Sequence, residues 1–114
     1  MRHRKKRHLR GGRDRRRHEL RALVTALVLY EKIETTAARA RLARAKAERL
    51  ITRAKKLDLA ARRAILRDLP RQATRKIFEV LAPRYQTRPG GYVRIAHAGH
   101  FKDGTKKVLL ELIQ

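Results

Sequence analysis

Apolar residues recur at helical spacing near the start of the chain. Behind a polar stretch that ends at His18, four of them occupy positions i, i+3, i+4 and i+7: Leu20, Leu23, Val24 and Leu27. Residues at this spacing share one face of a helix, so the pattern predicts an amphipathic helix that begins near His18. The next segment, Lys32–Thr36, is short and β-prone, which favours a strand or an extended link.

A second helix is predicted from Ala37 to about Lys56, because Ala, Arg, Lys and Leu dominate this segment and all are good helix formers. Its apolar positions form one stripe: Ala43, Ala47, Leu50, Ile51, Ala54 and Leu57. Its cations spread over the other sides: Arg41, Arg44, Lys46, Arg49, Arg53, Lys55 and Lys56. With Glu48 as the only acid inside this helix, we expect phosphates to relieve its charge, and an ordinary exposed helix face is the alternative.

Two shorter helices are predicted next, separated by Pro70. Asp58 is a suitable N-cap for the first, which is expected to end at Leu69. Its inward positions are Ala61, Ile65 and Leu69. The second is expected over Arg71–Ala82 and ends where Pro83 interrupts it. Its apolar residues are Ala73, Ile77, Val80 and Leu81.

The last part of the chain has the pattern of a β-hairpin. Apolar and polar residues alternate over Tyr92–Ala98, Lys102-Asp103-Gly104 is typical of a hairpin turn, and Val108–Ile113 is a mostly apolar strand. Arg88–Gly91, just before the hairpin, is a turn pattern. A run of helices with a small sheet at one side indicates an α+β fold.

Charge changes this picture. The 114 residues include 32 Lys or Arg and 10 Asp or Glu, a net charge of +22, which opposes compaction and indicates a polyanionic partner. Residues 1–17 hold ten of the cations and one acid, with Met1 and Leu9 as their only sizeable apolar residues. They cannot bury enough surface to offset their ordering entropy. We therefore expect a basic arm at 1–17, disordered when free, ahead of a single globular domain at 18–114.

Arginine outnumbers lysine in this arm by eight to two. Guanidinium groups bond phosphates bidentately and stack on exposed bases, so we interpret the arm as a nucleic-acid ligand rather than a solubilising or localisation tail. Its candidate contacts are Arg2, His3, Arg4, Lys5, Lys6, Arg7, Arg10, Arg13, Arg15, Arg16 and Arg17. For His3 and His8, solvated spectators are as consistent with the sequence as RNA contacts are.

Other kinds of chemistry have little support. The chain has no Cys, which excludes disulfides and thiolate metal sites, and its five His lack the spacing of a metal motif. No apolar run reaches the roughly 18 residues of a membrane span, and Arg21 interrupts a stretch that superficially resembles a signal peptide. Paired carboxylates and a P-loop are also missing from the sequence. We expect a cytoplasmic protein that is not an enzyme and takes no cofactor, metal or small-molecule substrate.

Eight segments, in order along the chain, carry a resemblance to a known family: Met1–Lys5, Ile33–Thr36, Leu50–Lys55, Arg62-Arg63, Arg75–Phe78, Leu81–Tyr85, Arg88–Ile95 and Leu110–Ile113. The sharpest is Arg88-Pro89-Gly90-Gly91-Tyr92-Val93-Arg94-Ile95. The chain resembles the bacterial large-subunit ribosomal protein seventeen family. It departs from the family pattern in the Arg-rich stretch Leu9–Arg17, where the family is rich in Ser and Asn, and at Glu34, where the family usually has Lys.

The resemblance implies a two-layer α+β domain of about four helices with a small three-stranded mixed sheet. It also implies a structural role near the polypeptide tunnel exit of the large subunit, with large-subunit rRNA and neighbouring ribosomal proteins as partners. Beyond the arm, the candidate RNA-binding residues are Arg39, Arg44, Lys46, Arg88 and Arg94. Tyr92, beside Gly90-Gly91, is expected either to contact RNA or to pack in the core.

Two other classes are alternatives. A free DNA-binding or nucleoid-associated protein has the same composition, and sedimentation with the nucleoid instead of the large subunit would distinguish it. A membrane-active amphipathic protein is the other alternative. It is disfavoured because the chain has no Trp and the stripe of the 37–56 helix is mostly alanine, so insertion into a bilayer would be weak.

Overall fold

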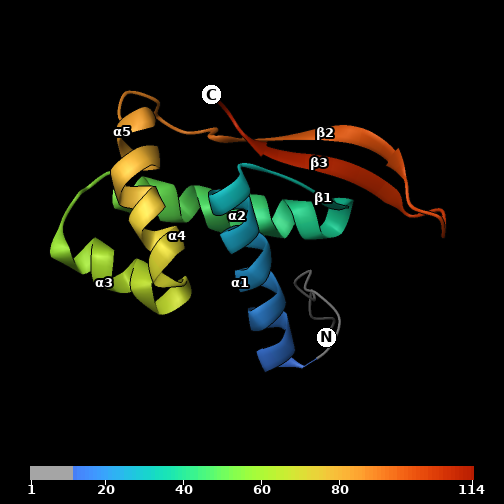
Figure 1. The fold of residues 1–114 in the computed structure, drawn as a ribbon, viewed down its shortest axis with the longest axis horizontal. Helices are drawn as coiled ribbons and strands as arrows, with labels where there is room; N and C mark the ends of the chain where they lie inside the picture. The colour runs from blue at the N-terminus through green and yellow to red at the C-terminus, as the bar shows by residue number, and fades with distance from the viewer. Residues whose placement is uncertain (1–11) are drawn as a thin grey trace, which may run out of the picture.

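The computed structural model describes residues 12–114 (Figure 1). Within them, a first helix is followed by a short strand, a series of further helices and a late hairpin. The elements are α1 (Arg13–Tyr30), β1 (Lys32–Thr36), α2 (Ala37–Ala54), α3 (Leu59–Asp68), α4 (Arg71–Lys76), the π-helical turn η1 (Ile77–Leu81), α5 (Ala82–Arg84), β2 (Val93–His100) and β3 (Lys106–Leu112). The sheet forms one layer and the helices form the other, which confirms the predicted α+β class.

The sheet is antiparallel throughout, so the expectation of a mixed sheet is wrong. Its strand order is β1-β3-β2, and β3 runs antiparallel to both neighbours. β3 takes the centre because Val108, Leu110 and Leu112 alternate along it and are all buried. A mixed sheet needs at least one parallel pair of neighbouring strands. β1 and β2 run in the same direction, but the hydrophobic strand β3 lies between them, so they do not pair.

The core lies between the sheet and α2. This helix buries an alanine-rich stripe made of Ala40, Ala43, Ala47, Leu50, Ile51 and Ala54. Small side chains let other elements approach the helix axis closely. Around this core, α2 contacts α1, α3, η1, α5 and all three strands of the sheet. The predicted stripe is confirmed apart from Leu57, which is 61% exposed. The reason is that α2 ends at Ala54 and Leu57 adopts a left-handed backbone conformation.

Helix α1 begins five residues earlier than the sequence pattern predicts. It starts at Arg13, after Gly12, and Asp14 in its first turn interacts favourably with the positive end of the helix dipole. Arginine is a good helix former, so the polar turns before His18 extend the helix although they carry no apolar stripe. Residues 13–17 thus belong to α1 and Gly12 is its N-cap, whereas residues 1–11 of the predicted arm lie outside the described part of the chain.

The predicted start of α3 is confirmed by its cap. The Asp58 carboxylate accepts a hydrogen bond from the Ala61 backbone N–H at 2.7 Å, and Ala61, Ile65 and Leu69 are buried as expected. This cap satisfies one of the free N–H groups of the first turn.

The predicted helix over Arg71–Ala82 continues to Arg84 by changing its winding. Residues Ile77–Leu81 form a π-helical turn, and the Ala82 N–H bonds to the Ile77 carbonyl. Pro83 lacks an N–H and would clash with a regular α-helical turn, and the wider turn just before it lets the chain continue helically. The change of winding also rotates Val80 outward, so that it is 41% exposed instead of facing the core.

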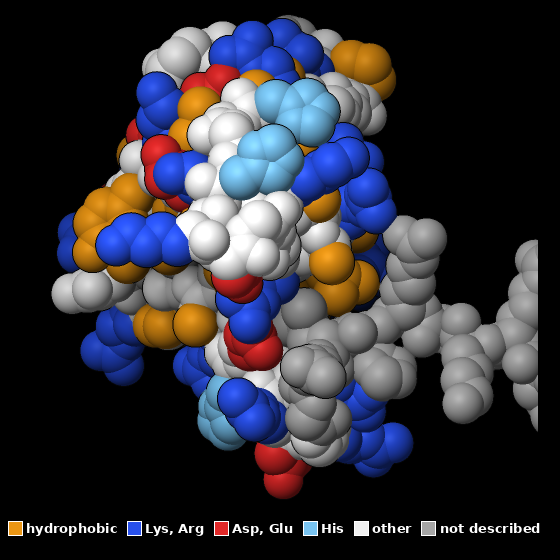
Figure 2. Space-filling model, turned by 90° about the vertical axis from the view of Figure 1, so that its right-hand side faces the viewer, with side chains coloured by type: hydrophobic (Ala, Val, Ile, Leu, Met, Phe, Trp, Pro, Cys, Tyr) orange, Lys and Arg blue, Asp and Glu red, His pale blue; other side chains and the backbone are white. Residues whose placement is uncertain are grey.

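The hairpin forms where the sequence predicts it, with its turn at Lys102–Gly104. Gly104 has φ +89°, and the Thr105 N–H bonds to the Asp103 carboxylate at 3.0 Å, which lowers the pKa of Asp103. Beyond Ile95 the expected alternation in β2 stops, and a register shift lies between His97 and His100. This end projects past the helices (Figure 1). Figure 2, which views the molecule from this end, shows exposed His, Lys and Arg side chains.

One acidic residue, Glu31, joins the two layers. Its backbone has φ +63° at the end of α1, where its N–H bonds to Leu27 and its carbonyl accepts the Leu112 N–H at 2.8 Å. Its carboxylate accepts hydrogen bonds from Lys76 at 3.0 Å and from Arg84 at 2.5 Å. The hydrogen bond from Arg84 is the main reason why the pKa of Glu31 is lowered to about 2. The hydrogen bond from Lys76 and the positive charges of both residues act in the same direction, whereas partial burial opposes them.

Replacing this carboxylate should destabilise the fold in a pH-dependent way. The folded-state pKa lies below the ordinary value of 4.5, so the stabilisation is complete above about pH 5 and is lost as the pH falls toward 2. We expect Glu31→Gln to lower the free energy of unfolding by about 2–3 kcal/mol at pH 7. Urea unfolding of the full chain at a series of pH values measures this.

A matched control for this substitution is Glu79→Gln. Glu79 pairs with Arg75 one helical turn away, and both side chains are well exposed. Its loss should change the free energy of unfolding by less than about 0.5 kcal/mol. Equal losses in the two variants would contradict the special role of Glu31.

Candidate nucleic-acid interface

The ten acidic residues all lie within residues 12–114, and most are used to hold the fold together. Six of them form ion pairs: Arg39–Glu19, Lys46–Asp68, Arg75–Glu79, Lys76–Glu31, Arg84–Glu31, Arg94–Glu111 and Lys107–Glu34. Asp58 caps α3 and Asp103 closes the hairpin turn. Because the cations outnumber the acids by three to one, the fold must leave many cations without a carboxylate.

The outer face of α2 collects such cations. Its exposed members are Arg41, Arg44, Arg49, Arg53 and Lys56, just beyond the helix end. At 100° per residue Arg41, Arg49, Arg53 and Lys56 fall on the side away from the buried alanine stripe, and Arg44 lies at the edge between the two sides. None of the five forms an ion pair with any residue in 12–114. A row of unneutralised charge on one rigid helix is suited to a polyanion rather than to an isolated acidic group.

A groove of about 590 Å³ runs beside this face. One wall is α2, with Lys46, Arg49, Arg53 and Lys56, and the other is the loop before β2, with Gly90 and Gly91. Gly91 has φ +66°, a conformation that favours glycine, and neither glycine places a side chain between its backbone and the groove. A phosphate can therefore approach the loop closely. Glu48 and Asp68 also line the groove, so its charge is positive but not uniformly so.

The loop is fixed to α2 by Lys55 and Tyr92. The Lys55 ammonium donates to the Arg88 carbonyl at 2.5 Å and to the Tyr92 hydroxyl at 2.9 Å, and the Tyr92 hydroxyl in turn donates to the Arg88 carbonyl at 3.4 Å. The Tyr92 ring is fully buried and lies 5.0 Å from the Tyr85 ring. Tyr92 is thus a packing residue, the second of its two expected roles, and Lys55 is a tether rather than a free cation.

The surroundings of Tyr92 also affect its acidity. Burial raises the pKa of its hydroxyl, and hydrogen bonds from Lys55 and from Thr52, at 3.4 Å, together with the Lys55 charge, outweigh burial and lower the pKa below its ordinary value. A hydroxyl that accepts from an ammonium group is held firmly in place. The loop that forms the second wall of the groove is therefore rigidly positioned.

Within the same described residues, the structure holds no group of three or more His, Asp and Glu side chains that could bind a metal ion. No helix in residues 12–114 combines the length and the apolar character required to cross a bilayer.

Comparison with known proteins decides the family. Residues 19–113 match the family described as ribosomal protein L17. The chain belongs to this family. The match covers both the candidate interface and the hairpin, so the resemblance to this family is confirmed, although the first of the eight segments, Met1–Lys5, lies outside the matched residues.

Relatives named large ribosomal subunit protein bL17 match over nearly the whole chain. The protein of Thermodesulfovibrio yellowstonii is 43% identical, with 99% of this chain and 87% of the relative covered. That of Hydrogenobaculum sp. is 44% identical, with both chains fully covered. That of Desulforamulus reducens is 48% identical over 86% of this chain and 89% of the relative. The family and its relatives are named for a place in the ribosome, not for a reaction.

The structure places the candidate RNA-binding residues in three settings. Those of the first eleven positions lie outside the described residues: Arg2, His3, Arg4, Lys5, Lys6, Arg7 and Arg10. Those at the start of α1 are on its first turns: Arg13, Arg15, Arg16 and Arg17. Those of the domain are Arg39, Arg44, Lys46, Arg88 and Arg94. Contact of all these residues with RNA stays a prediction.

Three of the five domain candidates are engaged within the protein. Arg39 is 2.6 Å from Glu19, Lys46 is 3.0 Å from Asp68, and Arg94 pairs with Glu111 on the adjacent strand. Arg44 is exposed on the outer face of α2. Arg88 is exposed beside the groove, where its backbone carbonyl anchors Lys55.

The candidate set omitted four cations that the structure places on the outer face of α2: Arg41, Arg49, Arg53 and Lys56. The signal was present in the sequence, since a helical projection from the alanine stripe places all four on the opposite side. The unusual Glu34 also has an explanation. Its carboxylate lies 3.5 Å from Lys107 on β3, so it supports the sheet rather than facing a phosphate.

We predict that Tyr92→Phe loosens the loop and leaves the core intact. The ring and its packing against Tyr85 remain, but the Lys55 and Thr52 bonds to the hydroxyl are lost. Hydrogen–deuterium exchange of the segment 86–92 should speed up several-fold, with a loss of about 1 kcal/mol in the free energy of unfolding. Tyr30→Phe is the control, because Tyr30 is 75% exposed, and unchanged exchange in the Tyr92 variant would refute the tether.

Proposed function

We propose that the protein is a structural constituent of the bacterial large ribosomal subunit, where it binds and stabilises large-subunit rRNA near the polypeptide tunnel exit. Membership of the ribosomal protein L17 family and the name of its relatives support this role. The single structural observation that carries the proposal is the row of unneutralised cations on α2 beside the glycine-lined groove.

The mechanism is electrostatic and positional. Phosphates neutralise the cations of α2 and release counterions, which favours binding and relieves the self-repulsion of a chain with a net charge of +22. The basic residues ahead of Gly12, which the sequence predicts to form an arm, are expected to bring charge where a compact domain cannot reach. Their ordering entropy is offset by phosphate contacts. In this role the protein works in the cytoplasm within the ribosome, alongside neighbouring ribosomal proteins.

The function predicts where the protein sediments. In a cell lysate at moderate salt, the tagged full chain should travel with the large subunit, and ribonuclease but not deoxyribonuclease should release it. A free DNA-binding protein has the same charge and would instead travel with the nucleoid and be released by deoxyribonuclease. The second pattern would reject the proposed role.

A second prediction tests the α2 face directly. In the triple variant Arg49→Gln, Arg53→Gln and Lys56→Gln, the slope of log affinity against log salt for single-stranded RNA should fall by about 2, since each lost phosphate contact contributes roughly 0.7. Incorporation into the large subunit should weaken in parallel. The measurements are filter binding at several salt concentrations and sucrose-gradient sedimentation.

A matched control removes the same charge elsewhere. The variant Arg63→Gln, Arg71→Gln and Arg75→Gln changes three exposed arginines that do not line the groove. It should keep most of the salt slope and the incorporation. Equal effects of the two triple variants would mean that net charge, and not the α2 face, determines binding.

A further inference from the structure

A second groove lies next to the first. It has a volume of about 550 Å³ and lies between the first half of α1 and the end of α3. Its charged lining is Asp14, Arg17, Arg21, Lys46, Arg67 and Asp68, and His18 also lines it. These cations are not members of the outer α2 face, so the groove adds further positive charge to the surface.

The two grooves share one wall. Lys46 and Asp68 line both of them, and the Lys46 ammonium lies 3.0 Å from the Asp68 carboxylate. Their side chains are 30% and 40% exposed, so both can be reached from solvent. The ion pair therefore stands on the boundary between the two grooves.

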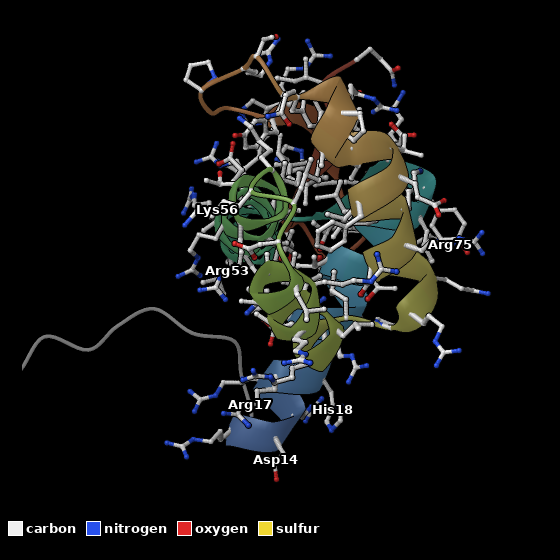
Figure 3. The ribbon with its side chains drawn as sticks, turned by 90° about the vertical axis from the view of Figure 1, so that its left-hand side faces the viewer. Asp14, Arg17, His18, Arg53, Lys56 and Arg75 are labelled. Atoms are coloured by element: carbon white, nitrogen blue, oxygen red, sulfur yellow. The ribbon has the colours of Figure 1, made fainter. Side chains whose placement is uncertain are left out.

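One cation of the second groove and two of the first extend toward the same side of the molecule. Figure 3 shows Arg17 pointing to the same side as Arg53 and Lys56, whereas Arg75 points to the opposite side. Together the two grooves present seven Lys or Arg side chains and three carboxylates, those of Asp14, Glu48 and Asp68. Along α2, the distance from Lys46 to Lys56 is about 15 Å at 1.5 Å per residue.

We propose that one continuous single-stranded segment of rRNA lies in both grooves and crosses between them at the Lys46–Asp68 pair. This inference rests on the proposed rRNA-binding function. Each groove has the volume of a small-ligand site, which is enough to hold nucleotides of a single strand. A positively charged groove that follows the backbone is the usual way to bind such a strand. Asp68 holds the Lys46 ammonium at the crossing, and this ammonium faces the phosphates of the strand in both grooves.

The absence of Cys from the chain allows a direct test. The single substitutions Arg21→Cys and Arg53→Cys, one in each groove, can each carry a tethered iron–EDTA group that generates hydroxyl radicals. In large subunits assembled with either labelled full-length protein, the cuts should fall in one rRNA segment at positions displaced along the strand. The pair Arg17→Cys and Lys56→Cys, also one in each groove, should cut the same segment and serves as a second pair if one variant assembles poorly.

Arg75→Cys is the control, because Arg75 points away from both grooves and should give none of these cuts. If the two probes of a pair cut rRNA segments that are distant in sequence, with no common segment, the inference is overturned while the rRNA-binding function stands. If the unsubstituted protein fails to join the large subunit, the proposed function itself fails.

Discussion

The Glu31 carboxylate connects parts of the chain that are far apart in sequence. It ends α1 in a left-handed conformation, and its carbonyl receives the N–H of the last residue of β3. Its side chain holds Lys76 and Arg84, on either side of the π-helical turn. The direction of the chain into β1, the attachment of the sheet and the position of the late helices therefore depend on one residue, through its backbone for the first two and its side chain for the third. A non-glycine residue is kept in this backbone conformation because its carboxylate has two cationic partners.

The scarcity of acids links stability to function. Only ten of the 114 residues are acidic, so few carboxylates can form ion pairs with the many cations. The ion pairs that do form hold α1 to α2, α2 to α3 and strand to strand. The outer face of α2 receives none of the ion pairs of residues 12–114. Its charge is therefore not balanced by the described residues, which is why we propose an external polyanion as its partner.

Local signals in the sequence predict much of the fold. The Asp58 cap, the alanine stripe and the Asp103-Gly104 turn depend on residues a few positions apart, and all three are confirmed. The errors arise where contacts between segments distant in sequence determine the structure. The centre of the sheet is set by packing of β3, and the tether from Lys55 to Tyr92 joins residues 37 positions apart. The groove is likewise a product of tertiary structure, because its walls come from α2 and from a loop after α5.

Helix α2 shows why an alanine-rich, arginine-rich sequence suits this role. A helix with a bulky apolar stripe would keep its neighbours at a distance, whereas alanine lets the sheet and the other helices approach closely. In its buried stripe only Leu50 and Ile51 are large side chains, and its outer positions carry arginine. The core and the proposed interface thus share one helix, which fixes the backbone positions of these cations relative to each other. In the proposed complex, the backbone of α2 needs no ordering on binding, in contrast to the predicted arm, so more of the electrostatic attraction at this face is available as affinity.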